Sequence, residues 1–361
     1  MYFLRCFIFL FSAFCSISIY AQFIEIDPDR EFLPDIELFR SDTIKEIIVW
    51  KAKSFGKNMP KTIGDRHIEA KYNINGKLRV YNIYDNNDFL LYTYRFKYNN
   101  NKYLVNVQKF DGQKKLAYQW FFEENLVKEE YKYYLDKDIE YAWFFTYDVL
   151  GNKTEEIKCN HYGKIIRRIY FVYNENNKII NISAYKTNDR FDYKWGITYD
   201  NNGDTVECHR LNKEYIVQES IIYKYHKKGQ LDSVVYIDNN RNERTLQKVF
   251  FYDVNGNIVC KITYDYNEMK EIKYLNTYNT NSKLIESVYF INQDRIHKKL
   301  YTYNKNQLCI NEKKIIFTGI TEIENVVSEI DRTINEDGFL QKQVEKDLTN
   351  RRTIVYTYKY F

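Results

Sequence analysis

The stretch "YDVNGN" at residues 252–257 contains residue types that could bind a cation. A calcium loop of the EF-hand type needs oxygen ligands at alternate positions, Gly at the sixth position and Glu at the twelfth. Counted from Asp253, Gly256 is the fourth residue and Tyr264 is the twelfth. Similar stretches elsewhere replace the Asp, for example with His226. We therefore predict a tight turn here, with no metal and no cofactor.

The sequence contains no catalytic motif that would indicate an enzyme. The sequence contains no G-x-S-x-G, HExxH or P-loop pattern. Cys208 and His209 are adjacent, but neighbouring residues of a strand point to opposite faces, so they could not bind one metal together. Carboxylates are numerous and no pair stands out. We expect no enzyme activity, and each histidine is predicted to be an ordinary sheet or turn residue: His67, His161, His209, His226 and His297.

The corner is one copy of an internal repeat. Aligning the chain on the aromatic residue before each corner gives successive spacings of 26, 24, 25, 26, 26, 26, 27, 26 and 25 residues. Asp or Asn usually follows this aromatic residue, and Gly or Asn often stands four positions after it. The aligned residues are Tyr72, Tyr98, Phe122, Tyr147, Tyr173, Tyr199, Tyr225, Tyr252, Tyr278 and Tyr303, with a poorer copy near Ile334.

This pattern predicts a β-hairpin in each repeat. Asp or Asn at the first position of a type I turn accepts a hydrogen bond from the backbone two residues on. Gly or Asn at the fourth position tolerates the left-handed conformation that starts a G1 bulge. Flanking runs such as "IVCKITY" (258–264) alternate as strands do. We predict an all-β fold of about ten tandem antiparallel hairpins in a curved, twisted meander sheet, open or partly wrapped.

The repeats resemble a known bacterial family. "FTYDVLGN" (145–152), "ITYDNNGD" (197–204) and "FFYDVNGN" (250–257) are similar to the Tyr-Asp repeats of RHS-type proteins and to MORN-like hairpin repeats. The resemblance covers roughly residues 70–345, although the repeat here is longer and no toxin domain is recognised after it. It implies a secreted β-hairpin repeat protein of the kind used for surface display or binding.

Four cysteines, Cys159, Cys208, Cys260 and Cys309, are spaced 49, 52 and 49 residues apart. These intervals equal about two repeats, or four strands. With strands about 4.8 Å apart, successive cysteines would be separated by about 19 Å in an open meander. A disulfide needs Cα atoms within about 7 Å. We predict four free thiols, largely within the sheet.

The first residues predict export. Arg5 is followed by a nearly continuous apolar stretch from Cys6 to Tyr20, and Ala21 precedes a polar residue, which is typical of a signal peptide. An uncleaved N-terminal anchor is the alternative. We predict three segments, namely a signal peptide at 1–21, an irregular lead at 22–43 that contains two of the three prolines, and one hairpin-repeat domain at 44–361. The protein should be periplasmic, cell-surface or extracellular.

The composition of the chain argues against several classes of protein. The chain of 361 residues is 44% hydrophobic and 29% charged, and it contains 36 Tyr and 24 Phe. Such a chain folds, and its aromatic residues favour strands. Without residues 1–21 it has 53 basic and 49 acidic residues, a net charge of +4 that is dispersed along the sequence. This charge predicts no nucleic-acid partner, and no later apolar run is long enough for a helical membrane span.

The repeated aromatic residues are the candidate binding surface. In a regular array they would fall in register, with cross-strand packing as their default role. If that face is bare, it would offer an aromatic platform to a glycan or a surface protein. We therefore predict a non-enzymatic binding or scaffold module whose aromatic face includes Tyr147, Tyr173, Tyr199, Tyr225, Tyr252 and Tyr278.

An outer-membrane β-barrel is the alternative function. The hairpin period fits such a barrel, and the C-terminal residues Ile354, Tyr356, Tyr358 and Phe361 resemble the terminal signature of that class. Charges within the strands oppose it. We expect Lys248 to share a face with Leu246 and Phe250, and Glu286 to share one with Leu284 and Val288, and a charge on a lipid-facing surface is costly. A carbohydrate-active enzyme is the third candidate.

Overall fold

The computed structural model describes residues 44–55, 64–85, 87–134, 138–227, 229–318 and 323–361. The predicted signal peptide and irregular lead lie outside these ranges. The described residues form 24 strands and one short 3-10 turn, η2 (Thr187–Asp189). The first twelve strands are β1 (Glu46–Phe55), β2 (Asp65–Tyr72), β3 (Leu78–Tyr84), β4 (Leu90–Tyr98), β5 (Leu104–Asp111), β6 (Leu116–Glu123), β7 (Leu126–Tyr134), β8 (Asp138–Tyr147), β9 (Lys153–Asn160), β10 (Ile165–Tyr173), β11 (Ile179–Lys186) and β12 (Arg190–Tyr199).

The second half of the chain continues in the same way. Each strand pairs antiparallel with the next, so the hairpins follow one another in chain order. The remaining strands are β13 (Thr205–Leu211), β14 (Val217–Lys227), β15 (Gln230–Asp238), β16 (Glu243–Tyr252), β17 (Ile258–Asp265), β18 (Lys270–Tyr278), β19 (Leu284–Ile291), β20 (Asp294–Tyr303), β21 (Cys309–Thr318), β22 (Ile323–Ile334), β23 (Leu340–Asp347) and β24 (Arg352–Tyr360).

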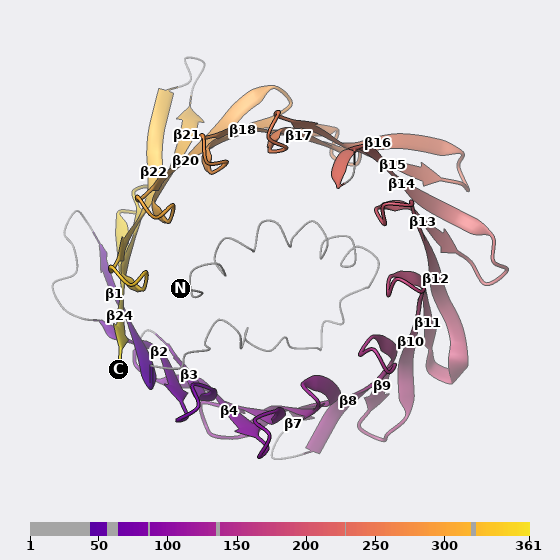
Figure 1. Ribbon diagram of the computed structural model, residues 1–361, viewed down its shortest axis with the longest axis horizontal. Helices are drawn as coiled ribbons and strands as arrows, with labels where there is room; N and C mark the ends of the chain where they lie inside the picture. Colours follow the sequence, from indigo (N-terminus) through magenta and orange to yellow (C-terminus); the bar gives the residue numbers. More distant parts are fainter. Residues whose placement is uncertain (1–43, 56–63, 86, 135–137, 228, 319–322) are drawn as a thin grey trace.

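The sheet closes on itself. β1 pairs antiparallel with β24 over nine residue pairs, from Ile47 opposite Tyr360 to Phe55 opposite Arg352. Figure 1 shows the resulting ring, with β1 and β24 side by side. The all-β hairpin order was predicted correctly, but an open meander of about ten hairpins was wrong, because the 24 strands make twelve hairpins and close into a barrel. Closure gives partners to the backbone N–H and C=O groups that two free edges would leave unpaired.

The two faces of the sheet differ in burial. We call the face that carries Tyr147, Tyr173 and Tyr252 the tyrosine face, and the other the opposite face. Both hydrophobic clusters lie on the tyrosine face. One surrounds Trp195 on β12, and the other includes Trp120 on β6. The alternation of strand side chains produces this difference, because residues two apart point the same way.

β-Bulges change the face of the sheet on which some side chains lie. In β16, Lys248 pairs with Val234 whereas Leu246 pairs with Val235, so an extra residue separates them. Lys248 and Leu246 therefore point to opposite faces, and the prediction that they share one was wrong. A bulge beside Leu284 also places Glu286 on the face opposite to Leu284, because Leu284 pairs with Tyr278 while Glu286 pairs with Thr277. The prediction that Glu286 and Leu284 share a face was therefore wrong. An extra residue inverts the alternation that a sequence pattern assumes.

Candidate functional site

The corner after Tyr252 has the geometry of the predicted turn. The Asp253 Oδ1 atom accepts hydrogen bonds from the backbone N–H of Asn255 and of Asn257, both at 2.9 Å. The N–H of Gly256 donates to the Asp253 carbonyl at 3.0 Å, and the φ angle of Gly256 is 83°. The turn is therefore confirmed, since the carboxylate is occupied by backbone donors. The described residues contain no group of three or more ligands that could hold a metal ion.

The repeated tyrosines bind the backbone through their hydroxyl groups. Tyr173, at the end of β10, donates to the carbonyl of Lys153 at the start of β9, at 2.8 Å. The same bond, to a carbonyl about 20 residues earlier, recurs around one rim of the barrel. The other donors are Tyr98, Tyr147, Tyr199, Tyr252, Tyr278, Tyr303 and Tyr360, to the carbonyls of Leu78, Val127, Ile179, Leu231, Ile258, Leu284 and Leu340.

These carbonyls lie where pairing with the following strand has ended. The pairing of β9 with β10 stops at Glu155 opposite Tyr170, and Lys153 lies two residues beyond it. Likewise, the pairing of β11 with β12 stops at Asn181, two residues from Ile179. The tyrosine hydroxyl thus replaces a lost ladder bond where the corner turns the chain away. A buried carbonyl without a partner costs free energy, so this bond stabilises the rim.

Lysine side chains cover several of these rings. The Nζ atom of Lys178 lies 5.1 Å from the Tyr199 ring centre, and that of Lys128 lies 5.3 Å from the Tyr147 ring centre. Lys178 also donates to the carbonyl of Gly203 in the next corner. A cation over a ring face is attracted by the ring quadrupole. Packing and hydrogen bonding are therefore roles that the geometry gives to this row.

Burial makes several tyrosine hydroxyls of this row less acidic. It raises the pKa of Tyr98 and of Tyr360 to about 12, because the phenolate would lose hydration. Burial also raises the pKa of Tyr225, with nearby Asp204 and Asp200 adding to the effect. The hydroxyls of Tyr98 and Tyr360 thus remain protonated donors throughout the physiological range.

The six predicted platform residues lie at one rim but not next to one another. Tyr147, Tyr173, Tyr199, Tyr252 and Tyr278 end alternate strands, so the intervening strand separates successive rings by about 10 Å. Tyr225 lies within β14, beside two irregularities of pairing. At Tyr225 the described structure shows no hydroxyl bond of the kind made by the other five. Their use as a binding platform remains a prediction.

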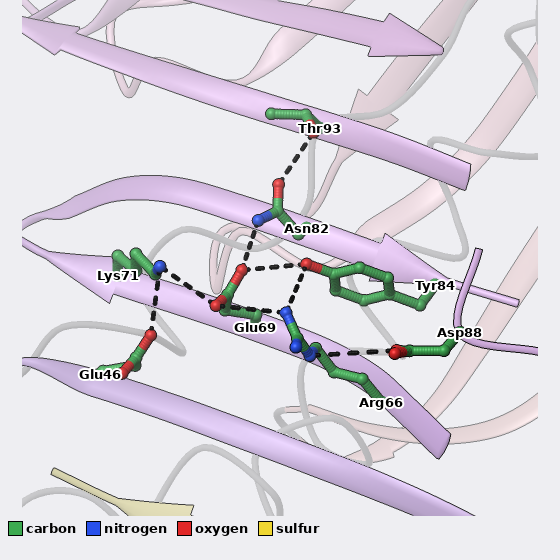
Figure 2. Close-up of polar contacts among 8 residues, drawn as sticks. All are labelled: Glu46, Arg66, Glu69, Lys71, Asn82, Tyr84, Asp88 and Thr93. Atoms are coloured by element: carbon green, nitrogen blue, oxygen red, sulfur yellow. Dashed lines mark hydrogen bonds and ion pairs between the residues drawn. The ribbon is translucent and has the colours of Figure 1, made fainter. Parts of the chain in front are cut away.

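Sequence reasoning missed an ionic network at the start of the barrel. The carboxylate of Glu69 accepts hydrogen bonds from Asn82 Nδ2 at 2.6 Å and from the Tyr84 hydroxyl at 3.0 Å. Lys71 Nζ lies 3.1 Å from Glu69 and 3.4 Å from Glu46 on β1. Figure 2 shows these contacts, which link β1, β2 and β3.

The network extends in both directions from Glu69. Arg66 donates to the Tyr84 hydroxyl at 3.1 Å and lies 3.9 Å from Asp88, while Thr93 donates to Asn82 at 2.8 Å (Figure 2). Desolvation alone would raise the pKa of Glu69, but the donors from Asn82 and Lys71 outweigh it and lower the pKa. The carboxylate is therefore ionised and fully engaged, which favours a structural role over catalysis.

A second network lies on the other side of the β1–β24 seam. Glu329 on β22 contacts Lys346 Nζ at 2.9 Å and Lys313 Nζ at 3.2 Å, and it accepts a bond from Asn311. These donors lower the pKa of Glu329 to about 2. Lys346 also lies 3.0 Å from Asp331. The two networks could not be read from motifs, because many of their contacts depend on cross-strand register, such as Glu46 with Lys71 and Glu329 with Lys346.

The four cysteines are free, as predicted. Cys159 and Cys208 are buried, while Cys260 and Cys309 are half-buried. Burial raises the pKa of Cys208 to about 12, so its thiol stays protonated. In the residues that the structure describes, no helix is long and apolar enough to cross a membrane.

Comparisons with known proteins assign no family. No family model matches the chain, and no curated protein matches it. The structure of TcdB2-TccC3 is 10% identical over 80% of this chain and 20% of its own, with a TM-score of 0.30. The Photorhabdus luminescens Tc holotoxin pore is 9% identical over 80% and 19%, also with a TM-score of 0.30. A porin-like protein from Bacteroides uniformis is 8% identical over 88% and 98%, with a TM-score of 0.27.

This chain thus spans about one fifth of the length of the first two structures. TM-scores of this size do not establish a shared function, so the RHS-type resemblance stays at the level of a β-hairpin repeat architecture. The functional conclusions below depend on the geometry of the chain itself.

Removing one rim hydroxyl tests the tyrosine bond. Tyr173→Phe should lower the free energy of unfolding by about 1 kcal/mol, because the Lys153 carbonyl loses its partner. The urea midpoint measures this loss. Tyr170→Phe is the control, because Tyr170 lies on the opposite face of the same strand and is 39% exposed. Equal midpoints for the two variants would contradict a stabilising role of the rim bond.

The Glu329 network predicts an acid-dependent loss of stability. The pKa of Glu329 is about 2 in the folded chain and about 4.5 when unpaired, so its contribution is complete above pH 4.5 and disappears as the pH falls toward 2. Glu329→Gln should cost about 1–2 kcal/mol at pH 7 and much less near pH 2. Urea midpoints between pH 2 and pH 7 measure the difference.

Glu336→Gln is the matched control, because Glu336 is exposed in a corner. Its midpoints should follow those of the original chain at every pH. A constant offset of Glu329→Gln from pH 2 to pH 7 would show that its charge is not responsible.

Proposed function

We propose that this protein is an exported, non-enzymatic β-ring that works in water as a binding or scaffold module. The observation that supports this proposal most strongly is the presence of ionisable side chains in the middle of strands on both faces. Lys109 on β5 and Lys158 on β9 lie on the tyrosine face, paired across strands with Tyr94 and Trp143. Neither could face lipid without a cost of about 2–4 kcal/mol at the bilayer midplane.

Charged side chains also lie within strands on the opposite face. Arg168 on β10 pairs across the sheet with Ile157 and Tyr185, and Lys273 on β18 pairs with Phe290. Glu286 on β19 lies on the same face as Val288. A lipid-facing surface needs an apolar band about 25 Å tall around the whole barrel. The charges within these strands interrupt such a band on both faces of the described sheet, which supports a hydrated setting.

An outer-membrane barrel is the second candidate, and closure is the observation that favours it. Antiparallel barrels with an even number of strands are the form in which β-sheets cross membranes, because closure pairs every backbone group. On topology alone, the closed barrel of 24 strands suits this candidate better than it suits an open binding sheet. The charge distribution favours the first candidate.

Cell fractionation distinguishes the two. When the full chain is expressed with its own N-terminus in a bacterium that has two membranes, it should appear in the periplasmic or extracellular fraction. It should stay monodisperse without detergent, because neither face requires lipid. Recovery only in detergent extracts of the outer membrane, with gel mobility that changes on heating, would overturn the hydrated ring in favour of the membrane barrel.

A further inference from the structure

Three aromatic rings on the opposite face form a contiguous cluster across β6, β7 and β8, and we call this cluster, with Glu129 beside it, the box. Phe121 contacts Tyr131 with ring centres 5.9 Å apart and ring planes at 89°. Phe144 contacts Tyr131 from the next strand, at 6.1 Å and 87°. Both phenyl rings therefore meet Tyr131 edge to face, in the geometry that aromatic pairs prefer. Phe121 is 37% exposed and Phe144 is 36% exposed, so the box is open to solvent.

A carboxylate lies between the two phenyl groups. Glu129 on β7 pairs directly with Phe121 on β6 and with Phe144 on β8, so the three side chains point to the same face in one row. The Tyr131 hydroxyl donates to Glu129 Oε2 at 2.8 Å, which holds the carboxylate beside the rings. Glu129 is half-buried and forms no ion pair in the described ranges of the chain.

A neighbouring aromatic cluster shows the same elements with a cation in place. Tyr185 meets Tyr170 at 6.0 Å and 75°, and Phe191 at 6.0 Å and 87°. There the guanidinium of Arg168 lies 6.0 Å from the Tyr170 ring centre, and its Nε atom is 3.3 Å from Glu155. The chain itself thus places a cation between rings and a carboxylate in this second cluster. Among the described residues, the box around Glu129 has the rings and the carboxylate without a cation.

We propose that the box formed by Phe121, Tyr131, Phe144 and Glu129 binds the quaternary ammonium group of a small molecule. Aromatic faces attract such groups, and a carboxylate beside them adds charge complementarity in a site that is partly shielded from water. This proposal depends on the binding role proposed above and assigns that role to a site away from the tyrosine rim.

Titration with choline tests the box. Saturation-transfer difference NMR on the full chain should detect the choline methyl groups, and 3,3-dimethylbutanol, the neutral isostere, should bind about tenfold more weakly or not at all. Glu129→Gln, which keeps the shape of the side chain, should weaken choline binding about tenfold. Phe144→Leu should weaken it as well, because one wall of the box is lost.

Glu155→Gln is the matched control, because it changes a carboxylate beside the neighbouring cluster and should leave choline binding intact. Urea midpoints for each variant separate loss of the site from loss of the fold. Equal binding of choline and its neutral isostere, or unchanged binding by Glu129→Gln, would overturn the proposal. Fractionation is independent of this result, so a protein that is soluble but does not bind choline would refute the box and leave the hydrated ring standing.

Discussion

The pairing of β1 with β24 is the constraint on which the rest of the barrel depends. In the described residues the sheet is a single layer, so each backbone N–H and C=O in a strand needs a partner on the next strand. An open sheet would expose two edges, which invite pairing with other chains. Nine residue pairs between Ile47–Phe55 and Arg352–Tyr360 remove both edges at once. The two ionic networks centred on Glu69 and Glu329 lie on either side of this seam, where their ion pairs join neighbouring strands.

The backbone groups at the corners need hydrogen-bond partners as well, and the tyrosines at the rim provide them. Each corner bends the chain out of the ladder, and the carbonyl two residues beyond the last pair loses its neighbour. At eight of the described corners a tyrosine hydroxyl supplies the missing donor, as Tyr173 does for Lys153. The bond requires tyrosine at these positions, because phenylalanine has no hydroxyl to donate. It also explains why a row that looks like a binding platform in sequence has its hydroxyls directed to the backbone.

Local features of the fold could be predicted from the sequence, and non-local ones could not. The Asp253 corner depends on residues within five positions of one another, so its turn and the left-handed Gly256 were predictable. Closure depends on the twist and curvature accumulated over 24 strands, which no single repeat specifies. Face assignments failed where bulges intervened, as between Leu246 and Lys248. The Glu69 network and the Glu129 box were missed because they are completed by contacts across strands, which require the strand register to be known.

Closure across the seam is tested most directly by a disulfide between β1 and β24. Ile48 and Lys359 are direct partners, and both point to the opposite face. Cysteines at these two positions should form a bond within one chain under mild oxidation, because partners across a strand pair lie within disulfide range. Cysteines at Glu46 and Thr353, which are not partners, should stay reduced under the same conditions. If the cysteines at 48 and 359 remain as free as this control pair, or link only different chains, then the sheet does not close and the ring is refuted.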